Sequence, residues 1–143
     1  MPATETTVCS PLRVTIVGVC ASGKSILAER LRGHGFEVHI VAQEHSCVPF
    51  LWRHGGPPGV LIYLGASWRM VRRRGRLGLS AAELREQRRR LRQAHRHAAV
   101  QVTTDHRSRS EVEAAVLRGI ARALLGRYTA EDEHHDRTER RAR

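Results

Sequence analysis

Short apolar runs alternate with longer stretches of mixed polarity through the middle of the chain. The apolar runs are rich in β-branched residues and predict strands at residues 12–17, 36–42, 60–64 and 98–102. Between the runs, apolar residues recur at helical spacing. This spacing predicts helices after Lys24, over residues 67–74, from Ser80 to His97 and from Ser110 to about residue 125. Alternating strands and helices favour a three-layer α/β/α fold with a small, mostly parallel sheet.

Local signals predict where several of these elements begin and end. Ser80 and Glu83 have the spacing of a capping box, and so do Ser110 and Glu113 at the start of the last predicted helix. A short helix is expected within residues 46–53. The cluster of Gly and Pro that follows it predicts a loop before the third strand.

One domain accounts for most of the 143 residues. The apolar pattern extends over residues 12–126, and we expect a flexible N-terminus at residues 1–11 and a disordered charged tail at residues 127–143. No apolar run is long enough to span a membrane, and the first eleven residues lack the order of a secretory signal. These features predict a cytoplasmic protein with no membrane partner.

An eight-residue segment between the first predicted strand and helix matches the pattern Gly-x-x-x-x-Gly-Lys-Ser. In such a segment the glycines let the backbone turn sharply and present N–H groups to phosphate oxygens. The lysine reaches the β- and γ-phosphates and the serine hydroxyl binds Mg²⁺. The pattern therefore predicts a binding site for ATP and Mg²⁺, with Ser25 as the metal ligand. Its residues are Gly18, Val19, Cys20, Ala21, Ser22, Gly23, Lys24 and Ser25.

The charge of the chain is strongly biased toward arginine. Of the 25 basic residues 24 are Arg, and the one Lys is Lys24 of the glycine-rich segment. A slender ammonium group at this position suits a site where a planar guanidinium would not fit beneath phosphates. The net charge of +11 predicts nonspecific, salt-sensitive attraction to nucleic acid, although a coding bias toward Arg explains such a charge equally well.

With strand, glycine-rich segment, helix and strand in this order, residues 12–125 resemble the P-loop NTPase superfamily, and their layout is similar to its nucleoside and nucleotide kinase-like group. The resemblance implies an ATP-dependent kinase whose lid carries arginines that close over the transferred phosphate. By position these are Arg72, Arg73 and Arg76. Such a kinase also needs a carboxylate that orients the acceptor or binds magnesium. Glu44 is the first candidate and Asp105 the second, because each follows a predicted strand.

Three functions remain open from the sequence. The first is a small-molecule kinase that acts on a nucleoside- or nucleotide-like acceptor. The second is a regulatory nucleotide-binding protein without transfer chemistry, because Gly65 stands where related kinases commonly have an acid and about 17 residues separate the second and third strands. The third is a nucleic-acid-binding module that uses the Arg-rich helix over residues 80–97. Its arginines are predicted to surround the helix instead of forming one stripe: Arg85, Arg88, Arg89, Arg90, Arg92 and Arg96.

Several properties stay undetermined at this level. The chain lacks the Asn-Lys-x-Asp segment that reads guanine and has Thr103-Thr104-Asp105 at the expected late position, which favours ATP without excluding GTP. The acceptor and the oligomeric state have no sequence signal. The three cysteines lack the spacing of a disulfide framework or a zinc site.

Overall fold

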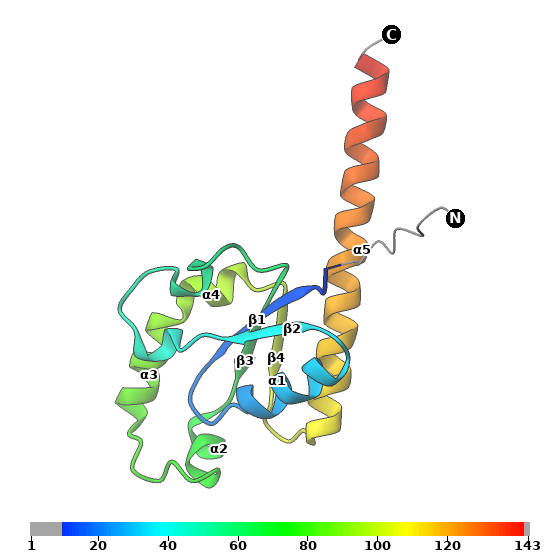
Figure 1. Cartoon of the computed structure of the whole chain (residues 1–143). Coiled ribbons are helices and arrows are strands. Elements are labelled where there is room, and N and C mark those ends of the chain that lie inside the picture. Colours follow the sequence, from blue (N-terminus) through cyan, green and yellow to red (C-terminus); the bar gives the residue numbers. More distant parts are fainter. Residues whose placement is uncertain (1–9, 142–143) are drawn as a thin grey trace, which may run out of the picture.

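The computed structural model describes residues 10–141, with side chains described as far as residue 127. Its centre is a four-stranded sheet in which every pair of neighbouring strands is parallel (Figure 1). The order across the sheet is β2-β1-β3-β4. The predicted α/β class is therefore confirmed. The strands are β1 (Arg13–Gly18), β2 (Glu37–Ile40), β3 (Val60–Gly65) and β4 (Val100–Thr103).

Helices cover both faces of the sheet. Apolar residues of α1 and α5 join the buried cluster on one face, and those of α2, α3 and α4 join the cluster on the other. This arrangement is compatible with the predicted three-layer α/β/α fold. The helices are α1 (Lys24–Gly33), α2 (Trp68–Arg73), α3 (Ala81–Arg90), α4 (Arg92–His97) and α5 (Arg109–Arg141).

The central strand β1 shows how the sequence produces this layering. Val14 and Ile16 pack into the cluster beneath α1 and α5, whereas Val17 packs into the cluster beneath α3 and α4. All three are fully buried. Because successive side chains of a strand point to opposite faces, a run that is apolar at nearly every position fits only a strand covered on both sides.

Two local predictions need correction. The short helix expected within residues 46–53 is instead a single 3₁₀ turn, η2 (Leu51–Arg53), and another 3₁₀ turn, η1 (Gln43–His45), lies just before this segment. The capping box of the last helix is formed by Ser108 and Glu111, not by Ser110 and Glu113, because the reciprocal side-chain to backbone hydrogen bonds join the first pair. Ser108 and Glu111 have the same spacing as Ser110 and Glu113. The carboxylate of Glu113 is bound by Arg30 and His34 instead, so the first pair forms the capping box.

The last helix, α5, continues to Arg141, past the boundary that the fading apolar pattern placed at residue 126. Residues 1–9 and 142–143, which belong to the expected terminal segments, lie outside the described part of the chain. No helix in the described part has both the length and the apolar character needed to cross a membrane.

The connections of the sheet create a crevice at its carboxyl edge. From β1 the chain passes through α1 to β2 on one side, and from β3 it passes through α2, α3 and α4 to β4 on the other. The loops that follow β1 and β3 therefore diverge onto opposite faces. In open parallel sheets ligands bind at such a switch point.

The contact between α5 and β4 gives a test of the fold. A Cβ at Gly119 would lie 2.7 Å from Cγ1 of Val100, whereas a Cβ at Gly126 in the same helix meets nothing within 4 Å. We expect Gly119→Ala to lower the free energy of unfolding by about 1–3 kcal/mol through overpacking. Gly126→Ala should raise it by about 0.5–1 kcal/mol through helix propensity. Urea denaturation measures both, and stabilisation by Gly119→Ala would contradict this packing.

Candidate functional site

The loop between β1 and α1, residues 18–25, lies at the crevice and contains the Gly-x-x-x-x-Gly-Lys-Ser segment. Gly18 is required by close packing, because a Cβ there would collide with the carbonyl oxygen of Leu64 on β3 and lie 2.9 Å from Ser22 Oγ. Gly23 has a φ of 97° and Ala21 a φ of 54°, both in the left-handed region. Left-handed residues within a turn orient successive N–H groups toward the same side, which makes a concave site for anions.

The amino end of α1 adds to this positive character. The helix begins at Lys24, and no side chain caps its N-terminus at Gly23. The first N–H groups of a helix have no partner within it, and its dipole places partial positive charge there. Ser25 is exposed in the first turn, while Ser22 is buried and its Oγ has no hydrogen-bond partner among the described residues.

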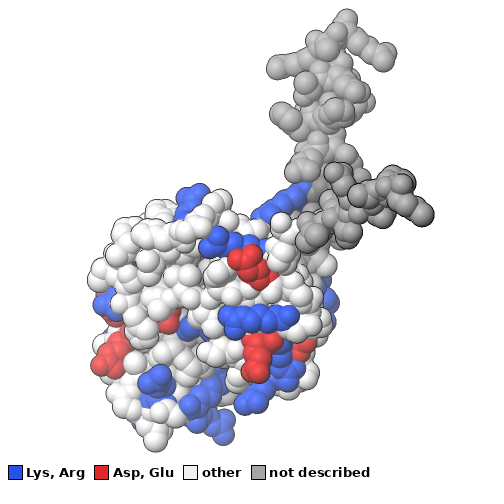
Figure 2. Space-filling model, viewed as in Figure 1, with Lys and Arg blue, Asp and Glu red and all other residues white. Residues whose placement is uncertain are grey.

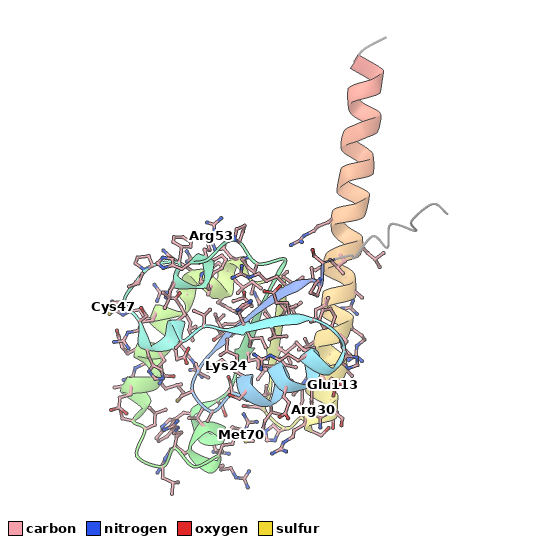
Figure 3. All side chains as sticks on the ribbon, in the orientation of Figure 1. Lys24, Arg30, Cys47, Arg53, Met70 and Glu113 are labelled. Atoms are coloured by element: carbon pink, nitrogen blue, oxygen red, sulfur yellow. The ribbon has the colours of Figure 1, made fainter. Side chains whose placement is uncertain are left out.

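Lys24 extends from this helix end back over the loop (Figure 3). Its Nζ donates hydrogen bonds to the carbonyl oxygens of Gly18 and Val19, each at 2.9 Å. The same Nζ lies 3.1 Å from Oε1 of Glu44 in η1, and the two side chains are only 11% and 4% exposed. The structure therefore brings together the two residues from which the sequence predicted phosphate binding and catalysis.

Glu44 has unused hydrogen-bonding capacity. Its Oε2 is buried and has no hydrogen-bond partner among the described residues, while Nε2 of the exposed His45 is 3.8 Å from Oε1. A buried carboxylate oxygen without a donor is costly, so it indicates a position where a donor from another molecule would be bound favourably.

The three arginines predicted to act as a lid are not brought to the loop. The guanidinium of Arg72 lies over the ring of Trp68 at 4.8 Å, and Arg73 and Arg76 are exposed. No hydrogen bond or ion pair joins any of the three to residues 18–25 within the described part of the chain. In this structure α2 presents a different member of the arginine run to the loop.

That residue is Arg74, which the sequence analysis did not select. Its Nη1 donates to the carbonyl oxygen of Ala21 at 3.0 Å and to Thr104 Oγ1 at 2.8 Å, and its Nη2 donates to the Thr104 carbonyl oxygen at 3.0 Å. One guanidinium thus connects the end of α2, the β1–α1 loop and the segment after β4. No spacing rule separates Arg74 from its neighbours, because the choice depends on Arg74 being the residue that follows the last turn of α2 as its C-cap.

Beside the loop lies a pocket of about 590 Å³. It extends from residues 21–23 and the first turns of α1 to Arg74 and the β4–α5 segment. Ile26, Leu27 and Val112 give it an apolar wall. Four arginines also line the pocket and give it positive charge: Arg30, Arg74, Arg107 and Arg109.

One of these arginines is held by a carboxylate. Arg30 forms an ion pair with Glu113 of α5 (Figure 3). His34 contacts the other oxygen of the same carboxylate at 2.7 Å. Hydrogen bonds from His34 and then Arg30 hold the pKa of the Glu113 carboxyl below its ordinary value. The pair fixes α1 against α5 on the side of the pocket.

Asp105, the second candidate acid, holds two turns together. Its Oδ1 accepts a hydrogen bond from the Ser67 backbone N–H at 3.0 Å, which joins the turn after β4 to the turn after β3. Burial by itself raises the pKa of Asp105, but hydrogen bonds from Ser67 and the charges of Arg74 and His106 outweigh it and lower the pKa. The side chain therefore connects two turns at the sheet edge, a role that Asp often has in turns.

Gln87 of α3 is a second residue that the sequence analysis missed. It is 5% exposed, and its Oε1 accepts a hydrogen bond from the Cys20 backbone N–H at 3.0 Å, while its Nε2 donates to Cys20 Sγ at 3.3 Å. A sequence signal was present. Gln87 lies three residues after Leu84 and four before Leu91, so it is a polar residue on the buried face of a helix.

Other side chains of α3 contact two further loops at the same sheet edge. Arg88 donates to the carbonyl oxygen of Ala66 after β3 at 3.1 Å, and Arg90 donates to the carbonyl oxygen of Glu44 after β2 at 3.3 Å. Together with Gln87, they connect one helix to the loops after β1, β2 and β3.

The described residues contain no group of three or more His, Cys, Asp and Glu side chains that could hold a metal ion by themselves. Comparisons with protein-family models, curated proteins and solved structures found no match to this chain. Any functional assignment therefore depends on the geometry of the site.

Replacing Gln87 tests how the β1–α1 loop is held. We expect Gln87→Leu to lower the free energy of unfolding by about 1–3 kcal/mol, because it leaves the buried Cys20 N–H without an acceptor. Gln93→Leu, on the exposed side of α4, is the matched control and should change it by no more than about 0.5 kcal/mol. If the two variants lowered the free energy of unfolding equally in guanidinium denaturation, the hydrogen bonds between Gln87 and Cys20 would contribute nothing specific to stability.

Proposed function

We propose that this chain is a P-loop kinase, which binds ATP and Mg²⁺ at the β1–α1 loop and transfers the γ-phosphate to a small nucleoside- or nucleotide-like acceptor. The observation that carries the proposal is the position of Lys24, which lies 3.1 Å from the buried carboxylate of Glu44 at the switch point of the sheet. A phosphate-binding loop, a lysine and an acid are groups that phosphoryl transfer uses, and their proximity supports the proposal.

The loop fits a triphosphate for three physical reasons. The absence of a Cβ at Gly18 allows β1 to approach β3 closely, left-handed residues curve the backbone, and α1 offers an uncapped N-terminus. Lys24 can exchange its two carbonyl acceptors for phosphate oxygens by rotating its flexible stem. The loop N–H groups, the N-terminus of α1 and the Lys24 ammonium all present positive charge, which favours a bound anion.

The donors near the loop also fit Mg²⁺, which prefers oxygen ligands and retains several water molecules. Ser25 would hold the ion with its exposed hydroxyl, and the unpartnered Oε2 of Glu44 would accept a hydrogen bond from one of those waters. When bound, the ion would neutralise charge on the β- and γ-phosphates.

Glu44 is the proposed general base. Its carboxylate takes the proton of the acceptor hydroxyl as the acceptor oxygen forms its bond to the γ-phosphorus. The bond from that phosphorus to the bridging oxygen breaks, and the electron pair leaves with ADP. Lys24, 3.1 Å from the carboxylate, would compensate charge on the phosphates.

The pocket beside the loop suits the nucleoside part of ATP. Its volume of about 590 Å³ lies within the range of small-ligand pockets, and its lining combines apolar side chains with guanidinium groups. We assign Arg74, which lies between pocket and loop, the phosphate-contacting role that the resemblance gave to Arg72, Arg73 and Arg76.

One observation favours a second candidate, a nucleotide-binding regulator without transfer chemistry. Between β2 and β3 the chain forms only the turns η1 and η2, so this connection contains no separate acceptor domain. A regulator would still use the loop, Lys24 and the pocket, but it would not need a base at Glu44.

The deciding experiment follows labelled phosphate. The purified chain is incubated with Mg²⁺, γ-labelled ATP and a panel of nucleosides, nucleotides and other small metabolites, with Lys24→Ala as the inactive control. We expect label to appear on one acceptor and transfer to fall at least about 100-fold in the variant, because a buried charge that compensates the phosphates is lost. Label that stays on ATP, despite Lys24-dependent ATP binding, would instead favour the regulator.

Replacing Glu44 separates binding from transfer. We expect Glu44→Gln to keep or strengthen ATP binding, because Lys24 loses a competing ion pair, while kcat falls by about 100- to 10,000-fold through loss of the base. Calorimetric ATP titration and the label assay measure the two effects. Glu29→Gln, on the exposed side of α1, is the control for removal of one carboxylate. Unchanged transfer by Glu44→Gln would remove Glu44 from the mechanism.

A further inference from the structure

Positive charge is concentrated in one layer of the molecule. Lys and Arg side chains outnumber Asp and Glu on the face shown in Figure 2, in keeping with the net charge of +11. Along the chain the excess is uneven. Residues 68–97, which form α2, α3 and α4, contain eleven arginines and only two acids, Glu83 and Glu86, a local excess of nine charges. One face of the sheet therefore has most of the net charge.

The structure separates the six arginines of α3 and α4 into two sets. Arg88 and Arg90 donate hydrogen bonds to loop carbonyl oxygens at the carboxyl edge of the sheet. The other four are exposed and follow one another at spacings of four, three and four residues: Arg85, Arg89, Arg92 and Arg96. Leu91, between α3 and α4, has a helical conformation, and helical hydrogen bonds run across it. At about 100° per residue the four arginines therefore lie within an arc of roughly 60°. The sequence predicted arginines all round the helix; the structure leaves one stripe, here called the arginine stripe.

The charges of this stripe are poorly compensated within the chain. Glu86 forms two hydrogen bonds with Arg89 and lies 3.4 Å from Arg90. These contacts lower the pKa of Glu86 and raise that of Arg89. Among the described residues no carboxylate lies within ion-pair distance of Arg85, Arg92 or Arg96. Three guanidinium groups thus remain available for an anion from another molecule.

A hollow adjoins the stripe on each side. One, of about 350 Å³, includes Arg89, Arg92 and Arg96 and the loop at residues 46–49. The other, of about 510 Å³, includes Arg85, Arg89 and Arg92 with Tyr63 at its base. Because the hollows share Arg89 and Arg92, they are adjacent parts of one basic surface. An extended anion can lie along such a surface, whereas a single small ion would occupy only one hollow.

From these observations we infer that the arginine stripe binds the phosphate backbone of a nucleic-acid strand. From Arg85 to Arg96 the helical rise is about 17 Å. At about 3.4 Å per phosphate of one strand, this length spans about five phosphates. Guanidinium groups match phosphate oxygens by paired hydrogen bonds. Of the large apolar side chains exposed in the described residues, only Val48 borders the hollows, which disfavours a membrane surface.

This inference is independent of nucleotide binding at the β1–α1 loop. The stripe borders other hollows than the pocket proposed for ATP. Helix α3 is near both, because it contributes two arginines to the stripe and its Gln87 contacts the β1–α1 loop. Binding of nucleic acid can therefore be measured without ATP, and failure of the kinase assay would leave it unaffected.

The test compares two variants with the same change in charge. One has the substitutions Arg85→Gln, Arg92→Gln and Arg96→Gln in the stripe. The other has Arg118→Gln, Arg122→Gln and Arg127→Gln on exposed positions of α5, which packs on the opposite face of the sheet. Fluorescence anisotropy follows binding of a labelled 16-nucleotide single-stranded RNA and its DNA counterpart from 50 to 200 mM salt. Thermal melting verifies that both variants are folded.

We expect the stripe variant to bind at least tenfold more weakly than the unaltered chain, and the α5 variant less than twofold more weakly. The plot of log K against log salt should lose about two units of slope in the stripe variant, because three phosphate contacts at about 0.7 each are removed. Equal weakening in both variants would reduce the effect to net charge and overturn the inference. Tighter binding to anionic vesicles or to inorganic triphosphate than to either strand would overturn it as well.

Discussion

The ion pair between Lys24 and Glu44 is the interaction on which the site depends. Both side chains are nearly buried, so loss of either one leaves the other without its ion-pair partner, which is costly inside a protein. Lys24 also closes the β1–α1 loop against the end of β1 through two carbonyl oxygens. Glu44 brings the turn after β2 to the same point. The pair therefore holds two loops from neighbouring strands in one place.

Helix α3 supports this arrangement from the other side of the sheet. Gln87 satisfies the buried N–H of Cys20, and Arg90 donates to the carbonyl oxygen of the residue whose carboxylate pairs with Lys24. These contacts require polar atoms at positions where an ordinary core helix would have apolar ones. Because unmet hydrogen bonds are costly inside a protein, the position of α3 and the conformation of the loop depend on each other.

The two surfaces of α3 differ in chemistry. Its inner surface has Leu84 and Gln87, and its outer surface has Arg85 and Arg89, the part of the arginine stripe that belongs to α3. An Arg-rich composition alone does not distinguish solvated charge from a binding surface, since both give the same net charge. The distinction comes from the contacts. Some arginines are bound to carbonyl oxygens or to Glu86, whereas others have no carboxylate partner among the described residues.

The sequence by itself determined what depends on near neighbours in the chain. The strand runs, the capping box at Ser80 and the glycine-rich segment were readable because backbone sterics and one-turn hydrogen bonds involve residues a few positions apart. The position of Glu44 beside the loop was predictable for a similar reason, since residues after parallel strands meet at one edge. Only the tertiary structure decided which arginine of the run over 72–76 reaches the loop, which capping box forms at α5, and that Gln87 binds Cys20. Those choices depend on contacts between residues up to 83 positions apart in the chain, and no local pattern contains them.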